Sequence, residues 1–90
     1  MIKMTEDYAF ATKEIKTIIS NSSLGPKKEV IESQIGLVLD FVENRDKNNK
    51  ETRLLSKNIR SLMHNKNLNK KEFVDGVNTM LTVTNLALYC

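Results

Sequence analysis

Residues 68–73 read Leu-Asn-Lys-Lys-Glu-Phe, and this short stretch decides how the chain folds. Asn69 followed by Glu72 fits a capping box, in which the two side chains satisfy backbone amides at the start of a helix. Leu68 and Phe73 have the spacing of a hydrophobic staple, which fixes the angle at which the chain enters that helix. We therefore predict a tight corner followed by a helix that begins near residue 69.

The segments on both sides of this corner have the spacing of amphipathic helices, and we predict helices over about residues 50–66 and 69–85. Apolar residues recur at steps of three and four in both: Leu55, Ile59, Leu62 and Met63, then Phe73, Val77, Met80 and Leu81. The end of the second segment is rich in Thr and Val, which have weak helix propensity. We therefore expect the helix to fray around Asn85 and the tail after it to pack on the rest of the molecule.

The N-terminal half predicts two more helices, over about residues 5–21 and 26–45. Thr5 can cap the first, and the Gly25-Pro26 pair marks the turn between them. The centre of the second, residues 35–42, is apolar on more than one face, so we expect this helix to be the most deeply packed. Gly36 within it predicts a close crossing with a neighbouring helix.

Four helices joined by short connections favour sequential antiparallel neighbours. Residues 44–50 contain no apolar side chain and are predicted to be a solvated connection. The 90 residues, 40% of them hydrophobic and 28% charged, suit one small folded domain. We predict an all-α fold over residues 1–90, an antiparallel up-down four-helix bundle.

The residue types that most enzymes and metal sites need are scarce in this chain. It has one histidine, His64, and one cysteine, Cys90, and its three glycines stand alone rather than in a phosphate-binding loop. We expect no catalytic residues, no metal, no cofactor and no small-molecule substrate. No apolar run is long enough to span a membrane or to serve as a secretory signal, so we expect a cytoplasmic protein that binds a partner.

Positive charge is concentrated in the C-terminal half. The formal net charge is +3, and residues 46–90 contain eight basic and four acidic side chains. Arg53, Lys57 and Arg60 step by four and three, so they share one helical face. Such a face attracts phosphates, an anionic membrane surface or an acidic patch on a protein.

Parts of this half resemble a known family. The stretches are Arg53-Leu-Leu-Ser-Lys-Asn-Ile-Arg-Ser-Leu-Met, Asn67-Leu-Asn, and Met80-Leu-Thr-Val-Thr-Asn-Leu-Ala-Leu-Tyr89. They are similar to the C-terminal half of immunity proteins against pediocin-like bacteriocins, the enterocin A immunity family. Residues 1–45 match that family only in length and helical layout.

The resemblance implies a bacterial antiparallel four-helix bundle that confers resistance from inside the cell. Such a protein recognises the bacteriocin bound to its receptor, membrane components of the mannose phosphotransferase system, and acts at the inner face of the membrane. The family's partner specificity is attributed to the C-terminal half, which is the basic half here. We therefore take as partner-binding candidates Arg53, Lys57, Arg60, Lys66, Lys70 and Lys71.

Two alternatives remain open. The basic face and the helix-turn-helix arrangement also suit a small nucleic-acid-binding or regulatory protein of phage or plasmid type. Glu72 and Asp75 make the first turns of the last helix acidic, which is unfavourable for a recognition helix in a major groove. The other alternative is a dimeric helical adaptor.

Overall fold

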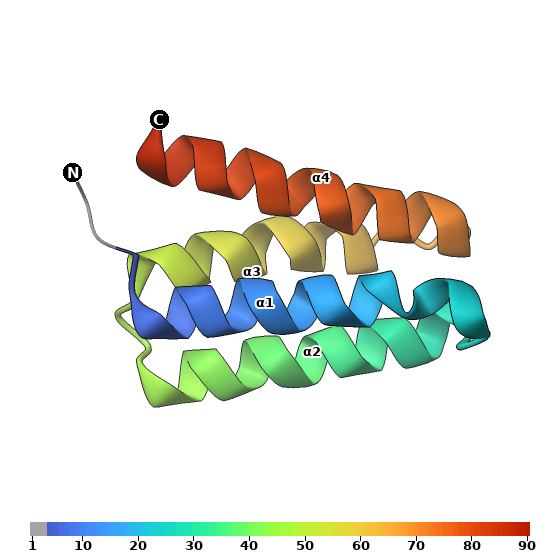
Figure 1. The fold of residues 1–90 in the computed structure, drawn as a ribbon, viewed down its shortest axis with the longest axis horizontal. Coiled ribbons are helices and arrows are strands. Elements are labelled where there is room, and N and C mark those ends of the chain that lie inside the picture. Colours follow the sequence, from blue (N-terminus) through green and yellow to red (C-terminus); the bar gives the residue numbers. More distant parts are fainter. Residues whose placement is uncertain (1–3) are drawn as a thin grey trace.

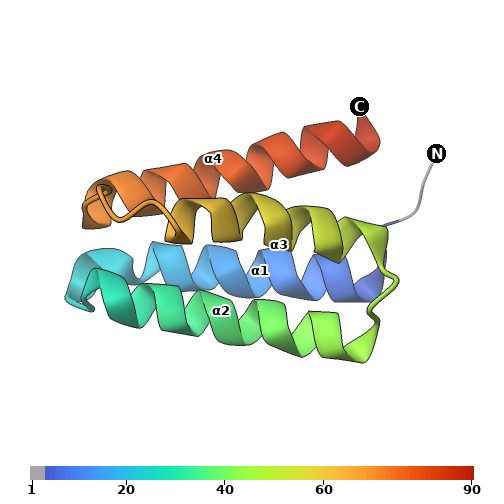
Figure 2. The same cartoon turned by 180° about the vertical axis from the view of Figure 1, so that it is seen from behind.

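Four antiparallel α-helices account for most of residues 4–90, the part of the chain that this computed structural model describes (Figure 1). They are α1 (Glu6–Ser20), α2 (Lys28–Arg45), α3 (Lys50–Met63) and α4 (Lys70–Tyr89), with a single 3-10 turn, η1 (Ser22–Leu24), between the first two. Seen from behind, the four helices run along one common axis, and each helix points opposite to the one before it in the chain (Figure 2). The predicted all-α, antiparallel four-helix bundle is confirmed.

Local capping signals set where the helices begin. The Thr5 hydroxyl accepts a hydrogen bond from the backbone N–H of Tyr8, 3.3 Å away, at the start of α1. At the start of α4, Asn69 and Glu72 exchange bonds of 2.8 and 3.0 Å with each other's backbone amides, which is the predicted capping box. Each cap supplies an acceptor to amides that have no partner inside the helix. Both predicted caps are confirmed.

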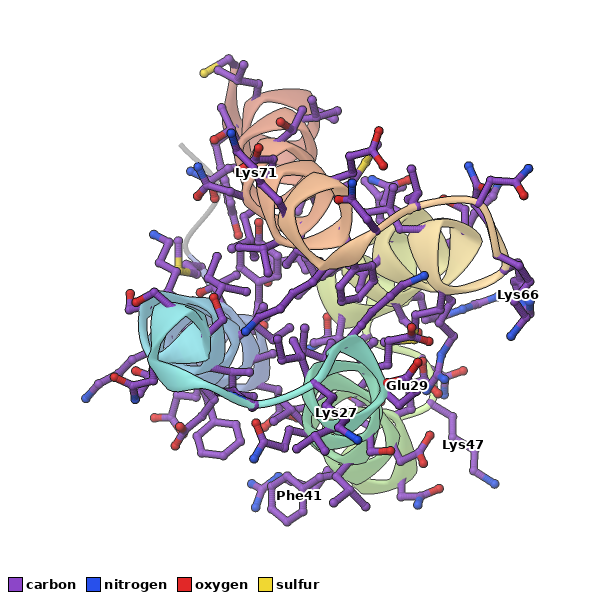
Figure 3. All side chains as sticks on the ribbon, turned by 90° about the vertical axis from the view of Figure 1, so that its right-hand side faces the viewer. Lys27, Glu29, Phe41, Lys47, Lys66 and Lys71 are labelled. Carbon is purple, nitrogen blue, oxygen red and sulfur yellow. The ribbon has the colours of Figure 1, made fainter. Side chains whose placement is uncertain are left out.

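Viewed along the bundle from one end, the helices occupy the corners of a square in the order α1, α4, α3, α2 (Figure 3). Their inward stripes form one core, in which no side chain is more than 4% exposed. Burying one large aliphatic or aromatic side chain contributes about 1.5–3 kcal/mol, so this shared core is the main source of stability. Its members are Tyr8, Ala11, Ile15, Ile31, Ile35, Leu39, Val42, Leu55, Ile59, Phe73, Val77 and Leu81.

The predicted end of the last helix is wrong. α4 continues through Tyr89 rather than fraying at Asn85, and there is no extended tail before Cys90. The β-branched Thr84 is fully buried and its hydroxyl accepts a 2.8 Å hydrogen bond from Asn58 on α3. Leu88 and Tyr89 pack against the core. These tertiary contacts outweigh the weak helix propensity of residues 82–84.

The other boundaries differ less from the predictions. α3 ends at Met63, three residues earlier than predicted, because the backbone N–H of Asn65 donates to the carbonyl of Leu62, three residues back, and not to that of Ser61. α2 begins at Lys28, two residues after the predicted start, and keeps its predicted end at Arg45. The connection from α2 to α3 is Asp46 to Asn49, inside the predicted polar segment.

The two expectations for the centre of α2 are also wrong. Its second apolar face is largely exposed: Leu37 is 69% exposed, and Phe41 is 49% exposed although its ring lies 5.5 Å from the ring of Phe10 on α1. A Cβ atom added to Gly36 would meet nothing within 4 Å, so no helix crosses there. The close approach occurs instead at Gly76 of α4, where an added Cβ would lie 3.2 Å from the Leu62 side chain of α3.

No helix among residues 4–90 combines the length and the apolar character needed to cross a membrane.

These glycine environments give the first prediction. Gly36→Ala should raise the free energy of unfolding by about 1 kcal/mol, because alanine favours the helix and the added methyl group meets no neighbour. The measurement is equilibrium unfolding in urea, followed by circular dichroism.

The matched control is Gly25→Ala, at the end of η1. Gly25 has φ +121°, which side chains rarely adopt, so this variant should lose stability although space is available. A Gly36→Ala protein less stable than the natural chain would show that α2 is packed differently from the structure described here.

Candidate partner-binding surface

The six predicted binding residues do not form one surface. Arg53, Lys57 and Arg60 lie on α3 and line a concavity beside the C-terminal end of α2. Lys70 and Lys71 lie in the first turn of α4 and line a different depression, beside Ser22 and Ser23 at the other end of the bundle. The structure therefore divides the predicted set into at least two places.

Lys66 belongs to neither group. It lies in the connection between α3 and α4 and is exposed. Figure 3 shows Lys66 and Lys71 pointing outward on opposite sides of this corner. Lys66 and Lys71 therefore do not share a face.

The concavity beside α3 has a volume of about 470 Å³ and is open to solvent. Its base includes Ser56, which is 4% exposed, and its rim carries both signs of charge. α3 contributes Arg53, Ser56, Lys57 and Arg60, and the α2 end with the following connection contributes Glu43, Asn44 and Lys47. Because most of these side chains are on two packed helices, their relative positions are fixed by the core.

Arg60 has a structural role in this concavity. Its guanidinium group lies 2.7 Å from an Asp40 carboxylate oxygen and 3.6 Å from one of Glu43, both on α2. Its Nε donates a 2.9 Å hydrogen bond to the Ser56 hydroxyl. Arg60 thus ties α3 to α2, and its charge is already matched by two carboxylates.

The remaining cations of the concavity are available for a partner. Among residues 4–90, Lys47, Arg53 and Lys57 take part in none of the ion pairs within 4.0 Å, and all three are exposed. Lys47 was not among the predicted residues, because it lies in the polar connection that we interpreted only as solvated. Its proximity to Arg53 and Lys57 depends on the packing of α2 against α3, for which no local motif exists.

A second polar cluster lies at the end of the bundle where α1 and α3 begin and α4 finishes. Glu51, at the start of α3, is buried and only 7% exposed. One of its oxygens accepts hydrogen bonds from the backbone N–H and the hydroxyl of Thr5, at 3.0 and 2.6 Å, and the other accepts from the Tyr89 hydroxyl. The Tyr8 hydroxyl donates to Asn85 at 3.1 Å, and the two tyrosine rings lie 6.0 Å apart.

These contacts shift the acid–base properties of three side chains. Burial by itself would raise the pKa of Glu51, but the hydrogen bonds from Thr5 and Tyr89 outweigh burial and hold that pKa below its ordinary value of 4.5. Burial, with the nearby Glu51 charge, raises the pKa of Tyr8. Burial and the hydrogen bond to Glu51 raise the pKa of Tyr89 as well. Perturbed pKa values can mark a reactive site, but both carboxylate oxygens of Glu51 face donors of the chain itself, which makes this a structural cluster.

No group of three or more His, Cys, Asp or Glu side chains that could hold a metal ion occurs in the described part of the chain. His64 is exposed at the end of α3, and Cys90 is exposed after the end of α4.

Comparisons of this chain with protein-family models, with curated proteins and with solved structures return no match.

The Glu51 cluster gives a prediction about pH and stability. Glu51→Gln should lower the free energy of unfolding by about 2 kcal/mol at pH 7, because bonds to a charged acceptor are lost and an amide N–H₂ faces donors. Since the pKa of Glu51 is lower in the folded protein than in the unfolded one, its contribution is complete above pH 4.5 and is lost as the pH falls through the folded pKa. The difference between the two proteins should therefore shrink in acid, as measured by urea unfolding at a series of pH values.

Asp75→Asn is the control, since Asp75 is exposed on α4 and takes part in no side-chain hydrogen bond or ion pair among residues 4–90. It should leave stability nearly unchanged at every pH. A Glu51→Gln protein as stable as the natural chain at pH 7 would contradict the assigned role of this carboxylate.

Proposed function

We propose that the protein is a cytosolic immunity protein, which protects its cell from a pediocin-like bacteriocin by binding the complex of bacteriocin and membrane receptor. Two findings support this proposal. The four-helix antiparallel bundle agrees with the fold that the resemblance of residues 53–89 implies. The described residues also offer an exposed, basic face on α3, in the half of the chain to which that resemblance attributes specificity.

The observation that carries the proposal is the pairing state of the α3 cations. Arg60 is held by Asp40 and Glu43, whereas Arg53 and Lys57 point from the same helix with no ion pair among the described residues. Charges that only tie the bundle together would be paired within it. Unpaired cations on a rigid helix instead provide steering and orientation toward an acidic surface of a partner.

This arrangement fits binding to a preformed membrane complex. The backbone of Arg53 and Lys57 is fixed on α3, so binding has to order only their side chains and not a segment of the chain. The net charge of +3 also favours the neighbourhood of the anionic cytosolic leaflet. The receptor components implied by the resemblance, those of the mannose phosphotransferase system, are reached from that side.

The nucleic-acid alternative has weaker support. Glu43 lines the same concavity as the cations, and Asp40 beside it is 62% exposed, so a phosphate backbone would meet two carboxylates. The exposed Asp75 and the capping Glu72 lie on the first turns of α4. A recognition helix normally presents neutral or basic side chains there.

Expression of the natural chain in a sensitive strain should raise the concentration of at least one pediocin-like peptide needed to stop growth. The double variant Arg53→Glu/Lys57→Glu should lose most of this protection, by about tenfold or more, because like charges would then face the partner. The measurement is the inhibitory concentration across a panel of such peptides, with the amount of protein in the cells checked by immunoblot.

The matched control is Lys13→Glu/Lys16→Glu, which changes the net charge equally at two exposed positions of α1. It should protect like the natural chain. Unchanged sensitivity to the whole panel when the natural chain is expressed would reject the proposed function.

A further inference from the structure

We infer that the concavity between α2 and α3 binds an acidic peptide segment, whose carboxylates meet Lys47, Arg53 and Lys57. The inference deepens the proposed function by naming the chemistry of the partner. It rests on the proposed function only for the identity of the protein that carries the acidic segment. Whether the concavity binds such a peptide can be tested without a bacteriocin.

Charge is unevenly distributed within the concavity. Arg60 on the rim is already engaged, because its guanidinium group is shared between the carboxylates of Asp40 and Glu43 at 2.7 and 3.6 Å. The cations that remain lie on the same rim and have no partner among residues 4–90. The three paired groups carry a net charge of −1, so the concavity has a weakly negative side and a positively charged side.

The spacing of the cations matches that of carboxylates on a peptide. Arg53 and Lys57 are separated by one helical turn, which puts their Cβ atoms about 5–6 Å apart on the surface of α3. Two carboxylates one turn apart on a helical peptide have the same separation, and alternate residues of an extended strand are only slightly farther apart. Arg53 can bind one carboxylate through two parallel N–H donors, while Lys57 and Lys47 contribute point charges.

The shape of the concavity suits a short segment of chain. Ser56 at the base is almost fully buried, and its hydroxyl accepts a bond from Arg60, so the base is polar and already hydrogen-bonded. A volume of about 470 Å³ accommodates a few side chains rather than a whole domain. A short segment that lies along α3 with its acidic side chains toward the cations fits this space.

The mixed signs of the rim favour a peptide over a polyphosphate. A nucleic-acid backbone carries closely and regularly spaced negative charges, and its binding strengthens with the number of phosphates neutralised. Here Glu43 lines the same concavity as the three cations, and its carboxylate would repel a phosphate. A peptide can place acidic residues opposite the cations and a neutral or basic residue opposite Glu43.

The experiment uses the full chain and a fluorescein-labelled, alanine-rich helical peptide with Glu at every fourth position, followed by fluorescence anisotropy at low salt. The natural chain should bind this peptide. Arg53→Glu/Lys57→Glu should weaken binding about tenfold or more. Lys47→Glu should weaken it too, which distinguishes the concavity from a stripe along α3 alone.

The control Lys13→Glu/Lys16→Glu removes the same amount of positive charge from α1 and should bind like the natural chain. Circular dichroism shows whether each variant is folded. Equal loss in both double variants would mean that only net charge matters, and this outcome, or no binding by the natural chain, overturns the inference. Tighter binding of a single-stranded oligonucleotide or of anionic lipid vesicles, lost in the same variants, would overturn it in favour of a phosphate ligand.

Failure of this inference is separable from failure of the proposed function. A natural chain that protects cells but does not bind the peptide would leave the immunity proposal in place and reject the acidic segment. A chain that binds the peptide through Lys47, Arg53 and Lys57 but protects against no bacteriocin would support the acidic segment and reject the immunity proposal.

Discussion

A single buried carboxylate, that of Glu51, holds together the three helix ends on which the shape of the bundle depends. Burying a charged group is costly unless it is fully hydrogen-bonded, and Glu51 accepts bonds from Thr5 before α1 and from Tyr89 at the end of α4. These bonds join the first residues of the described chain to the last turn of the last helix. Together with the buried Thr84 and the packing of Leu88 and Tyr89 on the core, these bonds keep α4 helical through a segment rich in Thr and Val.

The closed bundle determines which charges remain for binding. With α2 and α3 packed together, Arg60 is shared between Asp40 and Glu43, and Lys47 is brought next to Arg53 and Lys57. The basic character of residues 46–90 is thus divided into a paired part, which supports the fold, and an unpaired part that faces solvent. The proposed immunity function and the proposed acidic segment depend on this division rather than on net charge.

Local features of the sequence predicted the fold well, and features that depend on packing were missed. The caps at Thr5 and Asn69 and the apolar stripes act within one or two turns, so they are visible in the sequence. The end of α4 depends on Tyr89 meeting Glu51, 38 residues away in the chain, and no local pattern signals that contact. For the candidate site, the pattern of α3 predicted that Arg53, Lys57 and Arg60 share a face, but it could not show that Arg60 is paired or that Lys47 lines the same concavity. The prediction for Gly36 was wrong because the sequence alone does not distinguish a glycine with free space beside it from one that a neighbour packs against. Gly76, which is packed against Leu62, is of the second kind.

The central claim is that the concavity between α2 and α3 faces the partner in the cell. A photo-cross-linking amino acid placed at Asn44, an exposed and uncharged residue of the rim, tests it directly. In cells treated with a bacteriocin against which the chain protects, this position should cross-link to a membrane protein, and only when the peptide is present. The same amino acid at Thr17, exposed on α1, should not. Cross-linking from Thr17 and not from Asn44 would contradict the account and assign recognition to another face of the bundle.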